Sequence, residues 1–121
     1  MTSTGQEADP ATWSGFAVVV IEPDEPVFAG HYPGFPIFPG MCVVECVHRA
    51  GLLLAPDEAG DLVLAGMESV RFLTPVFPGD ELLVDLRWRR GADAWQLTGK
   101  AGTERGAAAS VRLRYRTAGA R

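Results

Sequence analysis

The chain has 121 residues, of which 47% are hydrophobic and 21% charged, and its formal net charge is −4. These values are typical of one globular domain with one core. No apolar run reaches the roughly eighteen residues of a membrane-spanning helix. An acidic chain without an aromatic-interleaved basic patch also argues against a nucleic-acid partner.

The first residues are polar and acidic, with neither a basic start nor an apolar stretch, so they do not resemble a secretory signal. We therefore expect a cytoplasmic protein. Residues 1–12 are expected to be poorly ordered, and residues 13–118 to form a single domain.

Residues 15–21, GFAVVVI, form a short β-branched run that predicts a buried strand, with a turn following at Pro23. Residues 27–30 could pair back as a second short strand. The segment HYPGFPIFPG, residues 31–40, is too rich in proline and glycine for a helix or a central strand. It predicts an ordered loop whose aromatic side chains pack against the protein.

Residues 41–54 predict the one long helix, with Pro39 just ahead of it and Pro56 behind it. Its polar residues share one stripe, at i, i+3 and i+4, and are Glu45, His48 and Arg49. All other positions are apolar or small. We therefore expect the helix to be buried over most of its surface.

The rest of the chain predicts strands, at residues 61–73, 81–90, 95–101 and 107–117. Gly66 marks an expected bulge or bend. Apolar and charged residues alternate in the second and fourth of these segments, as in strands with one buried face. One buried helix and several antiparallel strands predict an α+β domain in which the sheet wraps around the helix. Short connections after residue 80 favour an antiparallel meander.

Cys42 and Cys46 lie four residues apart on the predicted helix. This spacing suits a disulfide poorly, which indicates a reducing compartment. A zinc site would need further ligands beyond Cys46 and His48, so we expect no metal.

Charge is unevenly distributed along the chain. Residues 1–70 carry ten acids and one base, whereas residues 71–121 carry five acids and ten bases. The basic half could steer an acidic partner. Alternatively, these arginines are the solvated face of alternating strands.

Two polar residues stand apart from their apolar surroundings. His31 opens the proline-rich loop, and Glu45 lies about one turn inside the predicted helix. From spacing alone, His31 could be a packed or surface histidine, and Glu45 could form an ordinary ion pair with Arg49. A catalytic role for both is the alternative.

The segment FAGHYPGFPIFPGMCVVE, residues 28–45, resembles the active-site signature of the bacterial 3-hydroxyacyl-acyl-carrier-protein dehydratases, the FabZ/FabA-like family. That signature reads G-H-F-P, then P-x-x-P-G, a few apolar residues and an acid. Here Tyr32 replaces the phenylalanine, and Glu45 follows His31 at the family's spacing of fourteen residues. Residues 67–82, MESVRFLTPVFPGDEL, resemble the family's conserved strand and its P-V-x-P-G-D turn.

This resemblance implies the hotdog fold, an antiparallel sheet wrapped around one long central helix, with active sites shared between the subunits of a dimer. It also implies dehydration of a (3R)-3-hydroxyacyl thioester on acyl carrier protein to the trans-2-enoyl thioester, in fatty acid or polyketide and polyene biosynthesis. No cofactor or metal is implied. A homodimer is the simplest assembly, and a higher oligomer or a heterodimer is the alternative.

The family's roles carry over to matching positions. His31 of one subunit would be the base that faces Glu45, the acid, of the other. Burial in an apolar helix would raise the pKa of Glu45 and keep it protonated. Alternatively, His31 carries out both proton transfers and Glu45 only positions the hydroxyl or a water. The backbone N–H of Gly40 would stabilise the enolate oxygen, and a glycine there leaves room for close approach. The expected substrate tunnel is lined by Tyr32, Phe35, Phe38 and Met41.

Three features depart from the family's pattern. The chain lacks a further segment with an H-R-Y-P-F-like motif, and this short form is more similar to dehydratases of aryl polyene or polyketide pathways. Arg49 replaces the usual glutamine; it could pair with Glu45 and lower its pKa, point elsewhere, or contact an anionic group of the substrate or carrier. Cys46 and His48 replace small or apolar residues and could reshape the acyl tunnel.

Two other functions stay open, a hotdog acyl thioesterase and a non-catalytic partner subunit of a hotdog heterodimer. Cys42 lies in the first helical turn, where a thiolate would be stabilised, but its apolar neighbours favour a packing role. The presence of both His31 and Glu45 argues against an inactive subunit. An acidic carrier protein could dock on arginines such as Arg71, Arg87 and Arg112.

Overall fold

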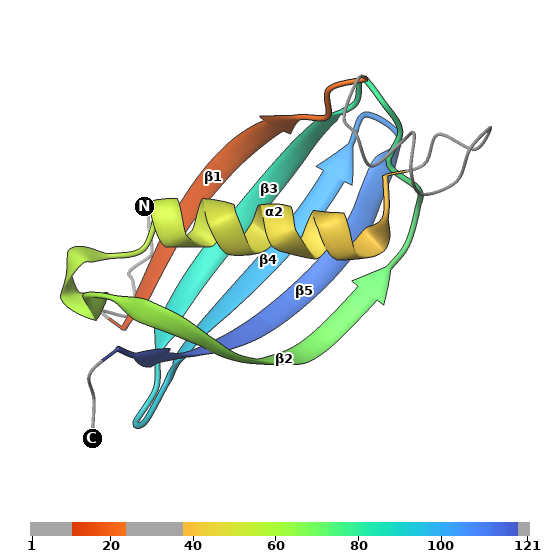
Figure 1. Ribbon diagram of the computed structural model, residues 1–121. Coiled ribbons are helices and arrows are strands. Elements are labelled where there is room, and N and C mark those ends of the chain that lie inside the picture. The colour runs from red at the N-terminus through yellow and green to blue at the C-terminus, as the bar shows by residue number, and fades with distance from the viewer. Residues whose placement is uncertain (1–10, 24–37, 119–121) are drawn as a thin grey trace, which may run out of the picture.

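A computed structural model of the protein describes residues 11–23 and 38–118. These residues form β1 (Thr12–Val20), α2 (Gly40–Leu53), the short 3₁₀ helix η1 (Asp57–Ala59), β2 (Leu62–Phe72), β3 (Glu81–Arg90), β4 (Trp95–Thr103) and β5 (Gly106–Thr117). The strands make one sheet in the order β1-β3-β4-β5-β2, and every neighbouring pair is antiparallel. α2 lies across one face of the sheet (Figure 1). The predicted α+β arrangement is confirmed.

The strand predictions agree with the structure to within a few residues. The predicted meander is formed by β3, β4 and β5, which follow one another in both the chain and the sheet. β2 carries a register shift between Leu64 and Gly66, where the bulge was predicted. β1 begins at Thr12, inside the range expected to be poorly ordered. Residues 1–10, the possible strand at 27–30 and residues 31–37 of the predicted loop lie outside the described residues.

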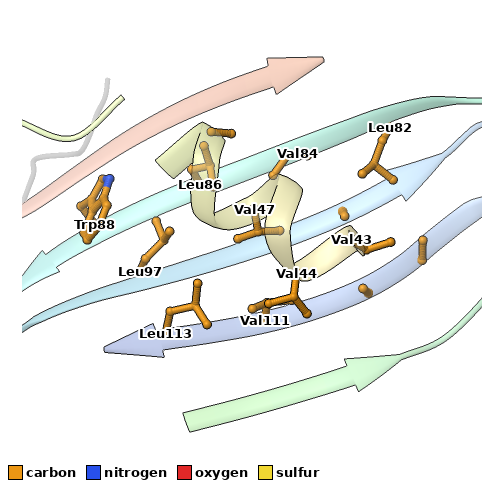
Figure 2. Close-up of a cluster of buried hydrophobic side chains, with 14 of the residues drawn as sticks. Val43, Val44, Val47, Leu82, Val84, Leu86, Trp88, Leu97, Val111 and Leu113 are labelled. Atoms are coloured by element: carbon orange, nitrogen blue, oxygen red, sulfur yellow. The ribbon is translucent and has the colours of Figure 1, made fainter. Parts of the chain in front are cut away.

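Alternation decides which face of the sheet meets the helix. Along β3, buried and exposed residues alternate from Glu81 to Arg89, and the buried ones are Leu82, Val84, Leu86 and Trp88. These side chains and those of β4 and β5 pack against Val43, Val44 and Val47 of α2 (Figure 2). The core therefore lies between the helix and the central strands, while the charged positions of the same strands face outward.

The helix differs in one respect from its prediction. Only its sheet-facing residues are buried, namely Val43, Val44, Val47, Ala50 and Gly51. Met41 and Leu53 are exposed, so the expectation of burial over most of the surface is wrong for the single chain. The reason is that one sheet covers only one side of a helix. Within the described residues, no helix has the length and apolar character needed to cross a bilayer.

Two glycines allow α2 to lie close to the sheet. A Cβ added at Gly99 of β4 would be 2.5 Å from Cγ1 of Val47. A Cβ at Gly51 of α2 would overlap the side chain of Leu97. Both positions are buried, so neither neighbour has free space to move into. These contacts set the distance between α2 and the sheet, and therefore the position of every α2 side chain relative to the sheet.

Gly99→Ala is expected to lower the free energy of unfolding by about 1–3 kcal/mol, because an added methyl group overpacks the contact with Val47. Urea unfolding of the variant and the parent measures this difference. Thr98→Ala, one residue away, is the matched control and should change stability by about 0.5 kcal/mol or less. Equal unfolding midpoints for Gly99→Ala and the parent would contradict the close packing.

Candidate active site

The described part of the predicted site lies along the first three turns of α2. Gly40 and Met41 begin the helix, and Phe38 precedes it. Glu45 and Arg49 follow one and two turns later on the exposed side. The remaining predicted residues, His31, Tyr32 and Phe35, lie outside the described residues.

Pro39 is the N-cap of α2 and has extended geometry, and its carbonyl accepts the N–H groups of Cys42 and Val43 at 2.9 and 3.3 Å. The N–H groups at the very start of a helix have no carbonyl partner within it. The N–H of Gly40 is one of these. It therefore fits the predicted role of hydrogen-bond donor to an anionic oxygen.

This helix terminus opens onto an apolar hollow of about 630 Å³. Its lining includes Phe38, Gly40, Met41, Phe72 and Val76. A Cβ on Gly40 would lie 2.7 Å from the Phe72 ring, so a larger residue there would require the exposed Phe72 ring of β2 to move. Sequence reasoning explained Gly40 by access for a ligand and missed the role of Phe72. Phe38 and Met41, two of the residues predicted for the substrate tunnel, line this hollow.

A second set of contacts holds the wall of this hollow. The N–H of Phe38 donates to the carbonyl of Val76 at 2.7 Å. Further along the same turn, the Asp80 carboxylate accepts the N–H of Phe77 at 2.7 Å and pairs with Arg105. The Arg105 guanidinium also lies over the Phe77 ring, 4.9 Å from its centre. The P-V-x-P-G-D turn seen in the sequence is thus fixed by its own aspartate.

Asp80→Ala is expected to lower the free energy of unfolding by about 1–2 kcal/mol at pH 7, because a charge-assisted hydrogen bond to Phe77 is lost. The Arg105 guanidinium lowers the pKa of Asp80 in the folded protein. The ionised Asp80 carboxylate therefore stabilises the fold at neutral pH. This stabilisation is lost as the pH falls below about 4 and the carboxylate is protonated. Urea unfolding at pH 7 and pH 3 tests this, with Asp80→Asn as a control that keeps an acceptor. A stability difference independent of pH would count against it.

Glu45 is held by Arg49 on the solvent side of α2. Arg49 Nε donates to Glu45 Oε2 at 2.7 Å, and the two side chains are 76% and 54% exposed. This contact lowers the pKa of the Glu45 carboxyl, which outweighs the small effect of burial. The expectation that burial raises this pKa is wrong for the single chain, because the helix leaves Glu45 open to solvent. Of the three possibilities for Arg49, pairing with Glu45 is the one observed.

A smaller hollow, of about 380 Å³, lies between α2 and β2. Glu45 and His48 line it from the helix, and Leu64 and Met67 line it from the strand. Met41 lines both this hollow and the larger one, so the two meet at that side chain. The structure thus brings Gly40, Met41 and Glu45 to adjoining cavities.

His48 makes a contact that sequence reasoning missed. Its Nδ1 lies 2.6 Å from the hydroxyl of Tyr115 on β5. Tyr115 is fully buried, and burial raises the pKa of its hydroxyl. Alternation had placed Tyr115 on the inner face, and a buried tyrosine needs a hydrogen-bond partner. The need of a buried Tyr115 hydroxyl for a hydrogen-bond partner was the one feature of the sequence that could have indicated its contact with His48.

The two thiols are not joined in a disulfide, as the spacing predicted, and both are half-buried. In the part of the chain that the structure describes, no three histidine, cysteine or acidic side chains come together as they would around a metal ion.

The profile of the ApeI-like family, described as ApeI dehydratase, matches residues 10–112. The chain belongs to the ApeI-like dehydratase family. It is 45% identical over 82 residues to a 3-hydroxyacyl-[acyl-carrier-protein] dehydratase, FabZ, of Symbiobacterium thermophilum. That match covers 62% of this chain and 58% of the relative. The chain spans about half to three fifths of the length of curated relatives that it matches.

Solved structures share the fold of this chain. The dehydratase heterocomplex ApeI:P from Xenorhabdus doucetiae superposes with a TM-score of 0.71 at 27% identity, covering 88% of this chain and 90% of that one. A hot-dog-like protein from Thermanaerovibrio acidaminovorans superposes with a TM-score of 0.73 at 15% identity, covering 88% and 82%. The dehydratase resemblance and the hotdog fold that it implied are both confirmed.

Proposed function

We propose that this member of the ApeI-like family removes water from a (3R)-3-hydroxyacyl thioester on acyl carrier protein, giving the trans-2-enoyl thioester. The observation that carries the proposal is the start of α2. There Gly40 and Met41 line an apolar hollow, and Met41 also lines the adjoining hollow of Glu45. An apolar cavity suits an acyl chain, and the helix terminus suits the thioester oxygen as it becomes negative.

In the proposed reaction, His31 acts as the base. Its neutral imidazole takes a proton from C2, and the electron pair of that bond moves onto the thioester carbonyl as an enolate. The Gly40 N–H stabilises the enolate oxygen. The enolate then collapses to the C2–C3 double bond as the C3–O bond breaks. The imidazolium returns its proton to the departing hydroxyl, which leaves as water, so the histidine ends neutral.

Glu45 is assigned the positioning role that the sequence left open. Because Arg49 lowers the pKa of its carboxyl, Glu45 is ionised at neutral pH and holds no proton to donate. An ionised carboxylate is a strong hydrogen-bond acceptor. It would therefore orient the 3-hydroxyl, or a water bound to it, while His31 handles both proton transfers.

A second copy of the chain belongs to this proposal, because the family shares each site between subunits. β2 is an edge strand, and among the described strands it pairs only with β5. Exposed apolar side chains lie on or beside it, namely Val63, Leu64, Met67, Phe72 and Leu73. Both hollows are lined partly by β2. A partner at this edge would cover them and bring its own His31 toward Glu45.

The assembly can be tested with one substitution at each edge of the sheet. Met67→Glu on β2 should convert the dimer to a monomer in sedimentation velocity, because it places a charge in the covered surface. Val18→Glu on β1, equally exposed, is the control and should leave the dimer intact. A monomeric parent, or dissociation by Val18→Glu alone, would contradict pairing at β2.

The acidic carrier is proposed to meet arginines on the outer face of the sheet. Arg87 of β3 and Arg112 of β5 both lie directly across from Thr98 of β4, so one row of the sheet carries two guanidinium groups beside a hydroxyl. Both arginines are exposed and line the same hollow. Arg71 is exposed on β2, two positions beyond Ser69, which pairs with Arg112.

The double substitution Arg87→Ala, Arg112→Ala is expected to weaken carrier binding by about tenfold at low salt, through the lost attraction. The parent should lose affinity as salt rises, since exposed charges are screened over about 10 Å at 0.1 M. Arg90→Ala is the control, because that guanidinium lies over the Trp13 ring. Binding measured by calorimetry that does not respond to salt would exclude this surface.

The reaction itself is tested by incubating the purified protein with a 3-hydroxyacyl thioester and with the saturated acyl thioester. We expect the enoyl product from the first, followed by its absorbance, and no reaction with the second. Release of free thiol without enoyl product would indicate a thioesterase. Activity only after a second hotdog subunit is added would indicate a heterodimer. The expected cytoplasmic location is tested by cell fractionation.

A further inference from the structure

The pair formed by His48 and Tyr115 lies next to Glu45 and has no part in the reaction as proposed. Tyr115 is held rigidly under α2. Its ring lies 4.9 Å from the Trp88 ring, and the Trp88 indole N–H donates to the carbonyl of Gly51 at 2.9 Å. The Tyr115 hydroxyl therefore has a fixed place beneath the helix, and His48 is bound to it through Nδ1.

The direction of this hydrogen bond follows from the surroundings of Tyr115. Burial and the nearby Glu45 carboxylate both raise the pKa of the tyrosine, so the hydroxyl keeps its proton at neutral pH. That proton needs an acceptor, since an unsatisfied buried donor is costly. Among the described residues, Nδ1 of His48 is the one acceptor that the hydroxyl contacts. The hydroxyl therefore donates, Nδ1 accepts, and the neutral ring carries its proton on Nε2.

The Nε2–H of His48 is thus a donor on the side of the ring away from Tyr115. His48 is half-buried and lines the smaller hollow together with Glu45. The two residues are three apart on α2 and so lie on the same side of the helix.

Glu45 therefore has two possible donors, Arg49 on the solvent side and His48 on the side of the hollow. The contact with Arg49 is exposed on both partners, and exposed pairs of this kind on a helix are weak. A subunit that covers β2 would shut water out of the hollow and strengthen hydrogen bonds within it. Oε1 of Glu45, which takes no part in the contact with Arg49, can then accept from His48 while Oε2 stays with Arg49.

We propose that His48, oriented by Tyr115, is a positioning residue that holds the Glu45 carboxylate toward the hollow where the substrate hydroxyl would lie. This inference rests on the proposed function, since it gives Glu45 its working orientation. It assigns a role to two residues outside the family's signature. Tyr115 acts only through His48, and His48 only through Glu45.

Kinetics of three variants test the proposal. His48→Ala should lower kcat by about ten- to a hundredfold with KM little changed, because misplacing a catalytic group costs rate rather than affinity. His48→Gln should restore most of kcat, since its amide N–H can donate to Glu45. Tyr115→Phe keeps the ring volume and should give an intermediate kcat. Unchanged kcat in His48→Ala, or equal losses in the alanine and glutamine variants, would overturn the proposal.

Nuclear magnetic resonance gives a readout that does not depend on turnover. The chain has two histidines, so the ring ¹⁵N signals of His31→Asn belong to His48 alone. We expect the tautomer protonated on Nε2, and a shift of the Nε2 signal when Glu45→Gln is added. A ring protonated on Nδ1, or signals indifferent to Glu45, would overturn the inference. An inactive parent with the expected coupling would instead refute the proposed function and leave this contact established.

Discussion

His31→Ala is expected to reduce the rate of enoyl formation by about 10²- to 10⁴-fold, the effect of removing a positioned group that transfers protons. In the proposed reaction one imidazole removes the proton from C2 and delivers a proton to the leaving hydroxyl. Without it, both steps depend on water. The loss should fall on kcat more than on KM, because the acyl chain is held by the apolar hollow beside Gly40.

Steady-state turnover of a 3-hydroxyacyl thioester measures this effect, and urea unfolding confirms that the variant is folded. His48→Ala, the other histidine of the chain, is the comparison: its loss should stay within the ten- to hundredfold expected of a positioning residue, and the loss in His31→Ala should exceed it. A His31→Ala protein that is folded and fully active would place the base elsewhere in the molecule.

Glu45→Gln is expected to lower kcat by about a hundredfold, because the amide keeps the shape of the side chain but not the acceptor strength of a carboxylate. The same residue gives a clear prediction about pH. If Glu45 works ionised, the rate falls as the pH falls through its pKa. Arg49 lowers that pKa, so Arg49→Gln, which removes the positive charge, should move the loss of activity to higher pH.

The opposite result is equally informative. If Glu45 works as a protonated acid, activity falls as the pH rises through its pKa, and Arg49→Gln would extend activity to higher pH. Profiles of kcat/KM from pH 4 to pH 8 for the parent and Arg49→Gln distinguish the two roles. Identical profiles would show that Glu45 does not titrate in the working enzyme.

The sheet could be predicted from the sequence because its determinants are local. β3 alternates between Val84, Leu86 and Trp88 on one face and charged residues on the other, and the structure has the predicted bounds. The helix followed from its flanking prolines to within one residue at each end. Its exposure could not be predicted, because local pattern does not tell whether an apolar helix is covered by its own sheet or also by a second subunit.

The site was predicted only in part, for a similar reason. The proline-rich motif predicted Gly40 and Glu45 as site residues, and the spacing on the helix predicted Arg49 as a possible partner of Glu45. Tyr115 was missed because it is 67 residues away from His48 in the sequence, and the contact exists only once β5 is placed under α2. The hollow shared by Glu45 and His48 depends on β2 in the same way.

The order of the strands in the sheet determines which of them can pair early during synthesis. β1 is synthesised before β3, its hydrogen-bonding partner in the sheet. Thr12 can therefore pair with Arg89 only after β3 has been synthesised. Until then Phe16, Val18 and Val20 have no sheet to join, and contacts between such distant segments form slowly. The meander of β3, β4 and β5 can assemble from neighbouring hairpins as it leaves the ribosome. A chain truncated before β3 would leave β1 exposed, with its apolar side chains and without a neighbouring strand to pair with. We therefore expect truncated forms to aggregate.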